Sequence, residues 1–421
     1  MVIDVENISD MIFGMSTQDE RLVSAAAAAE LLDVQTETIY TYVTRGNLVP
    51  HRINGDRSSW FKREDVERLK ARKRRRGSES PTRIATPDSR ITLIEDGYYW
   101  YRGYDPAKLA DDHSLEDVAE LIWAGELTNG LEWSVDQSSL PGPVASSSAL
   151  TLLDRVRLMS VELAVSDPLR YSTSTESILV IARRIMVGLV AGLPVLGDPL
   201  PTNSLASLLW PRLTTQPATP ESLHVLNAAL IVLADHGMAP ATQVARTAAE
   251  YRADPHGIIE GALTVLAGGW HGGRSFSAEE LIADIVDVGD AATVVGDRFR
   301  RQGRVASLGQ RRYEFGDPRP KILLRFLRDA VPDHPVHDAY ADLVAVVKRR
   351  ALPLPAVELG LAALGMVFEF VPGSTEAIFA IGRSVGWLGH AIEGYEAPDR
   401  ESPMFNYVGV RPFGPPPSLE E

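Results

Sequence analysis

The sequence contains no cysteine, which excludes disulfide bonds, thiolate metal sites and cysteine nucleophiles. It also lacks an uncharged apolar run of about twenty residues, so we expect no membrane-spanning segment. Its first ten residues, MVIDVENISD, are acidic and have neither the basic nor the apolar region of a secretory signal. These absences favour a cytoplasmic protein, for which we expect no metal site and no bound cofactor.

Charge is distributed unevenly along the 421 residues. The net charge is −14, but residues 45–76 hold twelve Lys and Arg against four Asp and Glu, so this segment carries +8 and the remainder −22. A basic segment on an acidic chain indicates local binding of an anion, with nucleic acid as the first candidate. The chain is also long enough, and at 45% hydrophobic residues apolar enough, to form more than one domain.

The basic segment belongs to a short unit at residues 22–76. Ser24 followed by AAAAAELL predicts an N-cap and a helix, and QTETIYTYVTRG predicts a second helix that ends at Gly46. Asn54–Gly55 lies between two short extended runs, which is the pattern of a two-residue hairpin. KREDVERLKARKRRR predicts a third helix. This order of elements is that of a winged helix-turn-helix.

Residues 22–70 of this unit resemble the MerR/excisionase class of DNA-binding heads. In that class the second helix enters the major groove and the hairpin contacts phosphates. The resemblance therefore implies DNA contacts from seven side chains: Thr36, Glu37, Thr38, Thr41, Arg45, Arg52 and Arg57. Residues 1–21 are expected to be an N-terminal tail, and the polar residues 77–90 a linker.

Residues 91–421 are predicted to be mainly helical. After a hairpin-like opening, helical periodicity dominates, and Ser114 with Asp117 predicts a capping box. Within this region LAGGWHGGRSF, residues 266–276, flanks His271 with two glycine pairs. Such a segment is either a turn with a solvated histidine or a place where the backbone passes close to a ligand. The pattern alone leaves both readings open.

The region resembles citrate synthase over about residues 91–412, through motifs that occur in the family's order. They are YRGYDPAKLADDHSLEDVAELIWAGEL, ADHGMAPATQVARTAAEYRADPHGIIEGALTVLAGGWHGG, GQRRYEFGDPRPKIL, PAVELGLAAL and IFAIGRSVGWLGHAIE. The resemblance implies a large and a small helical domain, the small one at roughly 237–350, and a homodimer. It also implies that the glycines at 268–273 let the backbone close on an acyl-CoA.

The family condenses acetyl-CoA with oxaloacetate, and the matched motifs imply roles for individual residues. His271 matches the histidine that stabilises the enolate, and His236 matches a histidine that binds oxaloacetate. Arg319 and Arg383 match two arginines that hold the substrate carboxylates, because a guanidinium pairs with a carboxylate through two hydrogen bonds. An acyl-CoA and a 2-oxo acid are therefore the expected ligands.

The sequence departs from the family at three places. Gln310 replaces the histidine of the third motif, and an amide can donate a hydrogen bond but cannot transfer a proton. Glu358 stands where the family has its aspartate base, which moves the carboxylate by one methylene. The last arginine motif has become DRESPMFNYVG, where only Arg400 lies near. Gln310, Glu358 and His271 are the candidate catalytic residues.

These departures leave three hypotheses. The chain is an acyltransferase that accepts oxaloacetate or a related 2-oxo acid and carries a DNA-binding head. Alternatively it is a dimeric transcriptional regulator whose altered domain senses a CoA ester or a keto acid. A third hypothesis is a subunit that pairs with an intact paralogue.

Overall fold

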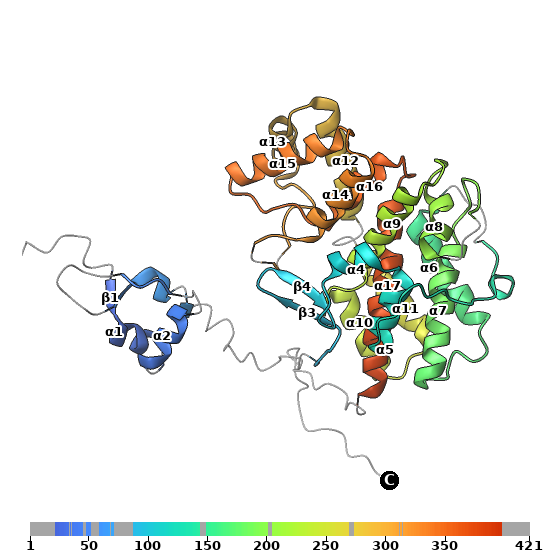
Figure 1. The fold of residues 1–421 in the computed structure, drawn as a ribbon, viewed down its shortest axis with the longest axis horizontal. Coiled ribbons are helices and arrows are strands. Elements are labelled where there is room, and N and C mark those ends of the chain that lie inside the picture. The colour runs from blue at the N-terminus through green and yellow to red at the C-terminus, as the bar shows by residue number, and fades with distance from the viewer. Residues whose placement is uncertain are drawn as a thin grey trace, which may run out of the picture. The chain divides into compact units, whose positions relative to one another are not determined.

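The computed structural model describes residues 22–32, 34, 36–44, 48–51, 59–67, 69–70, 87–143, 149–200, 204–268, 273–310, 312–313 and 315–397. The chain divides into two compact units, Met1–Asp88 and Ser89–Glu421. Helices predominate in both units, as the ribbon in Figure 1 shows. The prediction of a mainly α fold is confirmed.

In its described part, the first unit contains a two-stranded sheet and three helical segments, the third of which covers residues 63–67 and 69–70 within the predicted helix KREDVERLKARKRRR. Its other elements are β1 (Leu22–Ser24), α1 (Ala25–Leu32), α2 (Thr36–Thr44) and β2 (Trp60–Lys62). Ser24 caps α1 as predicted, because its Oγ accepts a hydrogen bond from the backbone N–H of Ala27 at 3.2 Å. β1 pairs antiparallel with β2. His51 and Trp60 exchange two backbone hydrogen bonds of 2.7 and 2.9 Å, on either side of the expected hairpin tip.

The first unit has a small hydrophobic core of its own. Its fully buried residues come from α1, α2, β2 and the segments beside them: Ala28, Ala29, Leu32, Ile39, Leu48, Phe61 and Val66. A core of this kind holds two helices and a sheet in a fixed arrangement.

The second unit opens with the predicted hairpin, β3 (Thr92–Glu95) and β4 (Tyr98–Tyr101). Asp96 and Gly97 form its turn, both with positive φ, which favours Asp and Gly at these positions. The helices α4 (Pro106–Asp112) and α5 (Leu115–Ala124) follow. The capping box at the start of α5 is confirmed, since Ser114 and Asp117 each accept from the other's backbone N–H.

In the rest of the second unit, the described regular elements are the short 3-10 helix η3 (Gln137–Ser139) and a series of α-helices. Its helices are α6 (Leu152–Val165), α7 (Thr175–Ala191), α8 (Leu205–Leu213), α9 (Pro220–Leu233), α10 (Pro240–Glu250), α11 (Pro255–Leu266), α12 (Gly273–Val288), α13 (Ala291–Gln302), α14 (Arg319–Ala330), α15 (Val336–Arg349), α16 (Val357–Val367) and α17 (Ser374–Glu396).

These helices form two groups, which we call the body and the lobe. In the body, α17 is buried along nearly its whole length and packs on α5, α6, α7, α9, α10 and α11. In the lobe, α12, α13, α15 and α16 pack on one another, and α14 contacts both α16 and α9 of the body. Figure 1 shows the lobe above the body. Two helices of the expected small subdomain at 237–350, α10 and α11, make their main contacts with α17 and α6 instead.

A glycine brings the backbone at the end of α9 against α17. At Gly386 a Cβ atom would lie 2.4 Å from Oδ1 of Asp235 and 2.5 Å from the carbonyl oxygen of Ala234. The missing side chain lets the N–H of Gly386 donate to that carbonyl oxygen at 2.8 Å. The turn that carries His236 is thereby held against the helix that carries Arg383.

No helix in the described ranges is long and apolar enough to cross a membrane.

Candidate active site

The predicted site residues come from both helix groups. His236 follows α9 and Arg383 lies on α17, whereas Gln310 precedes α14, Arg319 begins α14 and Glu358 lies in the first turn of α16. His271 and Arg400 lie outside the described residues. The candidate site therefore lies where the lobe meets the body.

His236 is a buried and uncharged histidine. Its side chain is 3% exposed, and Nε2 lies 2.9 Å from the hydroxyl of Tyr313. Burial lowers the pKa of His236 well below its usual range, and the positive charges of Arg319, Arg383 and Arg312 lower it further. A neutral imidazole among cations can exchange hydrogen bonds with a polar ligand without adding charge to the site.

Arg383 provides a buried cation with a free donor. It is 3% exposed, its Nε donates to the carbonyl oxygen of Leu233 at 2.7 Å, and its guanidinium lies 5.0 Å from the ring centre of Phe379. Its Nη2 is buried and has no hydrogen-bond partner among the described residues. Burial lowers the pKa of Arg383. Because an unsatisfied buried donor is costly, this nitrogen indicates a place for an anionic or carbonyl oxygen.

Arg319 is held by its neighbour Asp317. Its Nε and Nη2 donate to the two carboxylate oxygens of Asp317 at 2.9 and 2.8 Å, and both side chains are buried. Although burial opposes it, the charge of Asp317 raises the pKa of Arg319 above its usual value. The pairing uses the single N–H of Nε and one N–H of Nη2, so the N–H groups of Nη1 and the second N–H of Nη2 are not used by Asp317. Asp317 also accepts from the backbone N–H of Val357 at 3.0 Å, which connects Arg319 to the start of α16.

Glu358 forms an ion pair that the sequence motifs did not predict. Oε1 of Glu358 lies 3.0 Å from Nε of Arg274, a residue in the first turn of α12. Arg274 also reaches the carbonyl oxygen of Gly309, 3.4 Å from its Nη2. Gln310 follows directly and is half-buried, with its Oε1 accepting from the N–H of Arg312 at 3.4 Å. The side chain of Gln310 therefore retains its amide N–H groups as donors.

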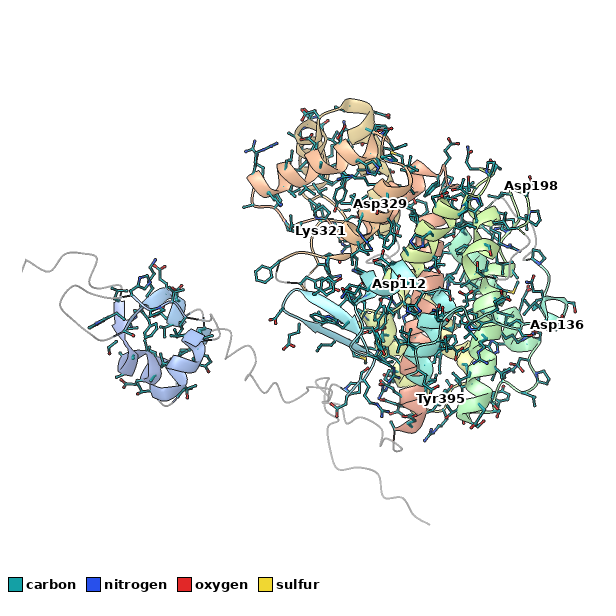
Figure 2. The ribbon with its side chains drawn as sticks, viewed as in Figure 1. Asp112, Asp136, Asp198, Lys321, Asp329 and Tyr395 are labelled. Atoms are coloured by element: carbon teal, nitrogen blue, oxygen red, sulfur yellow. The ribbon has the colours of Figure 1, made fainter. Side chains whose placement is uncertain are left out.

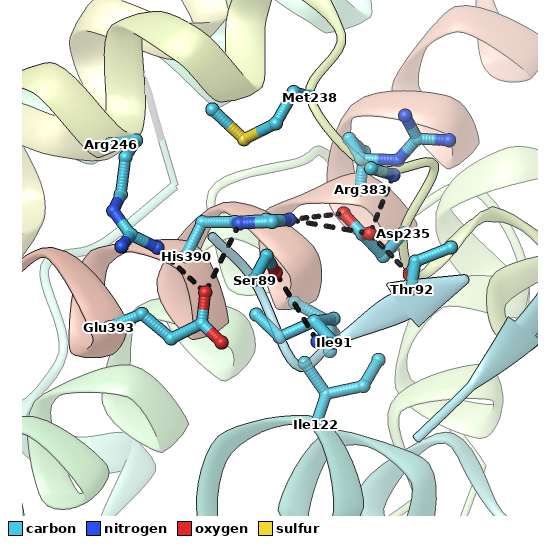
Figure 3. A network of polar contacts seen from close by, with 12 residues as sticks. Ser89, Ile91, Thr92, Ile122, Asp235, Met238, Arg246, Arg383, His390 and Glu393 are labelled. Carbon is cyan, nitrogen blue, oxygen red and sulfur yellow. Dashed lines mark hydrogen bonds and ion pairs between the residues drawn. The ribbon is translucent and has the colours of Figure 1, made fainter. Parts of the chain in front are cut away.

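A buried polar network supports the turn that carries His236 (Figure 3). Asp235 accepts from the hydroxyl of Thr92 at 2.5 Å and from the N–H of Gly237 at 2.7 Å. Nε2 of His390 on α17 lies 3.4 Å from the same carboxylate. Burial alone would raise the pKa of Asp235, but the charge of His390 and these hydrogen bonds outweigh it and lower the pKa to about 2. Asp235 is therefore a buried carboxylate that stays ionised.

The network continues along α17. Oε2 of Glu393 lies 3.8 Å from Nδ1 of His390 and 2.6 Å from Nη1 of Arg246, and the other oxygen of Glu393 accepts from the N–H of Arg90. Buried charges of this kind are tolerated because each has an opposite charge beside it. The network joins β3, α10 and α17 behind the candidate site.

Most of the newly found site residues lie inside the motifs already quoted. Asp235 precedes His236, and Tyr313 and Asp317 lie between Gln310 and Arg319. Arg274 follows the glycine pairs at 268–273, but no pattern in the sequence connects it to Glu358. The described part of the chain contains no group of three or more His, Asp or Glu side chains that could hold a metal ion.

The predicted DNA-contacting residues lie on or beyond α2. Thr36 and Thr38 are half-buried side chains of this helix. Glu37 and Thr41 also belong to α2, but their side chains lie outside the described part of the structure, as do Arg45, Arg52 and Arg57.

Comparison with known proteins identifies relatives for both units. A family described as citrate synthase, C-terminal domain, matches residues 82–403, and one described as MerR HTH family regulatory protein matches residues 23–78. The citrate synthase of Haloferax volcanii is 26% identical over 78% of this chain and 94% of the relative. A 2-methylcitrate synthase of Shewanella oneidensis is 27% identical over 74% of this chain and 89% of the relative.

Solved structures show the same fold. The citrate synthase of Thermotoga maritima matches 80% of this chain and 98% of its own with a TM-score of 0.62 and 21% identity. The enzyme of Thermoplasma acidophilum, in ternary complex with carboxymethyl coenzyme A and oxaloacetate, matches 81% of this chain and 98% of its own, with a TM-score of 0.64 and 22% identity. Both resemblances inferred from the sequence are confirmed.

Proposed function

Because the chain belongs to the citrate synthase family, we propose that it condenses a short acyl-CoA, such as acetyl-CoA, with oxaloacetate or a related 2-oxo acid. The observation that carries this proposal is the buried guanidinium of Arg383, whose Nη2 has no partner among the described residues and which lies beside the neutral His236. A carboxylate or keto oxygen would complete its hydrogen bonding. The relatives named citrate synthase and 2-methylcitrate synthase support the same chemistry.

In the proposed reaction Glu358 removes a proton from the carbon next to the thioester carbonyl. The electron pair of the broken C–H bond moves to the thioester oxygen, and His271 stabilises the resulting enolate by a hydrogen bond. The enolate carbon attacks the keto carbon of the acceptor, whose oxygen then gains a proton. Hydrolysis of the new thioester by water releases the thiol of CoA.

The acceptor acid is proposed to bind to the body side of the site. Arg383 and His236 contact its carboxylate and keto oxygens, and Arg319 contributes through Nη1. Gln310 donates a hydrogen bond to the keto oxygen as negative charge develops there. Since an amide cannot give up a proton, the proton that completes the hydroxyl group must come from water or from another side chain.

Thiol release tests the enzymatic proposal. The purified protein is mixed with acetyl-CoA or propionyl-CoA and a panel of 2-oxo acids, and free CoA is followed with a thiol reagent. The protein itself contributes no thiol, because the chain has no cysteine. Release that depends on both substrates supports the proposal, and no release above background with any acceptor contradicts it.

The head suggests a second function, since residues 23–78 match a family of helix-turn-helix regulators. We propose that this unit binds DNA through α2 and the basic residues that follow it. The protein would then be either an enzyme with a DNA-binding head or a regulator whose larger unit senses a CoA ester or keto acid. Removing residues 1–76 should abolish DNA binding and leave any thiol release unchanged. DNA affinity of the full chain should fall steeply with salt, because lysine and arginine contacts to phosphates release counterions.

A dimer would present two such heads to DNA. On α6, Leu158, Val161 and Val165 are 43%, 42% and 75% exposed and lie on one face of the helix. The nearby Leu169 and Tyr171 are also exposed. We propose that this apolar face packs on a second copy of the chain. A monomer in sedimentation would contradict this, and co-purification with a different citrate synthase chain would favour the paired-subunit hypothesis.

A further inference from the structure

The ion pair between Arg274 and Glu358 suggests a role for a residue to which no motif assigns one. We infer that Arg274 is the positioning residue for the base Glu358: it holds one carboxylate oxygen so that the other faces the substrate. The inference rests on the proposed function, because it takes Glu358 to be the base.

Arg274 is itself fixed at three points. Its Nε lies 3.0 Å from Oε1 of Glu358, and its Nη2 lies 3.4 Å from the carbonyl oxygen of Gly309. Its own carbonyl oxygen accepts from the hydroxyl of Ser307 at 2.8 Å. The guanidinium therefore connects the first turn of α16 to the segment that carries Gln310. A displacement of either part would be transmitted to the base.

The two oxygens of Glu358 are in different surroundings. Oε1 is paired with Arg274, whereas Oε2 is buried and has no hydrogen-bond partner among the described residues. Proton removal needs one free lone pair, so the geometry assigns the holding role to Oε1 and the proton to Oε2. When the C–H bond of the substrate breaks, the proton forms the O–H bond at Oε2 and the electron pair moves to the thioester oxygen.

A glutamate needs this support more than an aspartate would. Its extra methylene adds a rotatable bond between the backbone and the carboxylate, and each freely rotating side-chain torsion weakens the alignment of a base. The backbone of Glu358 is held through the preceding residue Val357, whose N–H donates to Asp317. The ion pair with Arg274 then restricts the far end of the side chain.

The contact depends mainly on charge. Nε of Arg274 makes no well-aligned hydrogen bond to a described residue, although it lies within ion-pair distance of Glu358. A lysine, which is also cationic and of similar reach, should therefore replace Arg274 in part. A glutamine should not, because it removes the charge at comparable size.

Steady-state kinetics of the full-length protein test the inference. In Arg274→Gln, we expect kcat to fall about 10- to 100-fold, which is the effect of a catalytic group misplaced by about 1 Å. The KM for acetyl-CoA should change less than about 2-fold, and Arg274→Lys should recover at least about a third of the lost kcat. The matched control is Arg298→Gln, since Arg298 also forms ion pairs with α12, to Glu280 and Asp284, but lies on α13 outside the site. The control should keep the wild-type kcat.

A double variant separates positioning from a direct role of Arg274. In Glu358→Asp the carboxylate is one methylene shorter and moves out of reach of the guanidinium. Adding Arg274→Gln to this variant should lower kcat by less than about 3-fold, because the interaction is already lost. An equal loss in both backgrounds would overturn the inference, since Arg274 would then act on something other than Glu358. An unchanged or raised kcat in Arg274→Gln would overturn it as well.

Hydrogen exchange distinguishes failure of this inference from failure of the proposed function. Wild-type protein and Arg274→Gln are incubated with acetyl-CoA and oxaloacetate in D₂O, and deuterium in the acetyl methyl group of recovered acetyl-CoA is measured by mass spectrometry. Exchange without thiol release would contradict condensation, yet slower exchange in Arg274→Gln would still support the positioning role. Equal exchange in both proteins would overturn the positioning role alone. No exchange and no thiol release in the wild type would overturn both.

Discussion

The two sides of the candidate site differ in how deeply their polar and charged side chains are buried. On the body side, His236 and Arg383 are each 3% exposed and Asp235 is fully buried. On the lobe side, the side chains of Arg274 and Glu358 are 32% and 16% exposed, and Gln310 is half-buried. Removing a buried charge leaves its partners unpaired and away from water, whereas the partner of a partly exposed charge can bond to water instead.

This difference in burial indicates on which side of the site residues can be substituted without destabilising the fold. The body side, where the acceptor acid is proposed to bind, is built into the core through α17 and the Asp235–His390 pair. The lobe side carries two of the three departures from the family pattern, Gln310 and Glu358, and the third, near Arg400, lies outside the described residues. Substitutions on the lobe side should therefore alter catalysis, and substitutions on the body side should also destabilise the protein.

The largest effect is expected from Glu358→Gln. The amide is nearly isosteric with the carboxylate but cannot take a proton, so kcat should fall about 10²- to 10⁴-fold. The melting temperature should stay close to that of the wild type, because the side chain is partly exposed. Thiol-release kinetics and circular dichroism measure the two quantities. A wild-type rate in this variant would show that another group is the base.

The next largest effect is expected from Asp235→Asn on the body side. Removing the charge leaves His390 and Arg383 with one anion fewer in a buried environment, so the free energy of unfolding should fall by about 3 kcal/mol. The pKa of Asp235 is lowered from its ordinary value of 3.8 to about 2. The ionised carboxylate therefore stabilises the folded protein at pH values above 3.8. This contribution is lost as the pH falls from about 4 to about 2. Urea unfolding at pH 7 and at pH 3 should therefore give a larger difference between the two proteins at pH 7.

A surface aspartate provides the control for that measurement. Asp136, labelled in Figure 2, caps η3 through hydrogen bonds to Ser138 and is exposed. Asparagine is also a good capping residue, so Asp136→Asn should leave the free energy of unfolding nearly unchanged. A similar loss of stability in both variants would mean that the buried network around Asp235 stabilises the protein no more than an exposed helix cap does.

The sequence predicted the parts of this site that short motifs encode. The N-cap at Ser24, the capping box at Ser114 and the proximity of His236 to Arg383 followed from local patterns or from the order of the family motifs. The pair between Arg274 and Glu358 did not, because the two residues are 84 positions apart and neither belongs to a repeating pattern. The packing of α10 and α11 on α17 also depends on tertiary contacts that no local signal specifies.

Gln310→His tests whether the lobe side lacks only a proton donor. A histidine at this position could give a proton to the keto oxygen, so we expect kcat to rise about 10-fold if Glu358 and the acceptor already align. Gln310→Asn, which keeps the amide but shortens it, is the matched control and should not raise kcat. An unchanged rate in Gln310→His would indicate that protonation of the acceptor does not limit turnover.

The smallest effect is expected at Glu376, where the body meets the lobe. This buried residue lies in the first turn of α17, two residues after the start of the helix, and next to it Thr375 donates to Glu279 of the lobe helix α12 at 2.5 Å. Burial, together with the negative charges of Asp154 and Glu279, raises the pKa of Glu376 to about 7. The folded protein therefore binds more protons here than the unfolded chain between about pH 4.5 and pH 7. The stability that this protonation contributes is fully present below pH 4.5 and is lost as the pH rises through 7.

Replacing Glu376 with Gln should remove this pH dependence. At pH 5 the variant and the wild type should unfold at similar urea concentrations. At pH 8 the variant should be more stable by about 1 kcal/mol, a figure kept small because the neighbouring charges are partly screened by solvent. Glu221→Gln is the matched control, since Glu221 occupies the first turn of α9 and is exposed. Its effect on the free energy of unfolding should be the same at both pH values. If Glu376→Gln instead lowered the free energy of unfolding at pH 8, the ionised carboxylate would have a stabilising partner in the folded protein. Ionisation of Glu376 would then not weaken the contact between body and lobe.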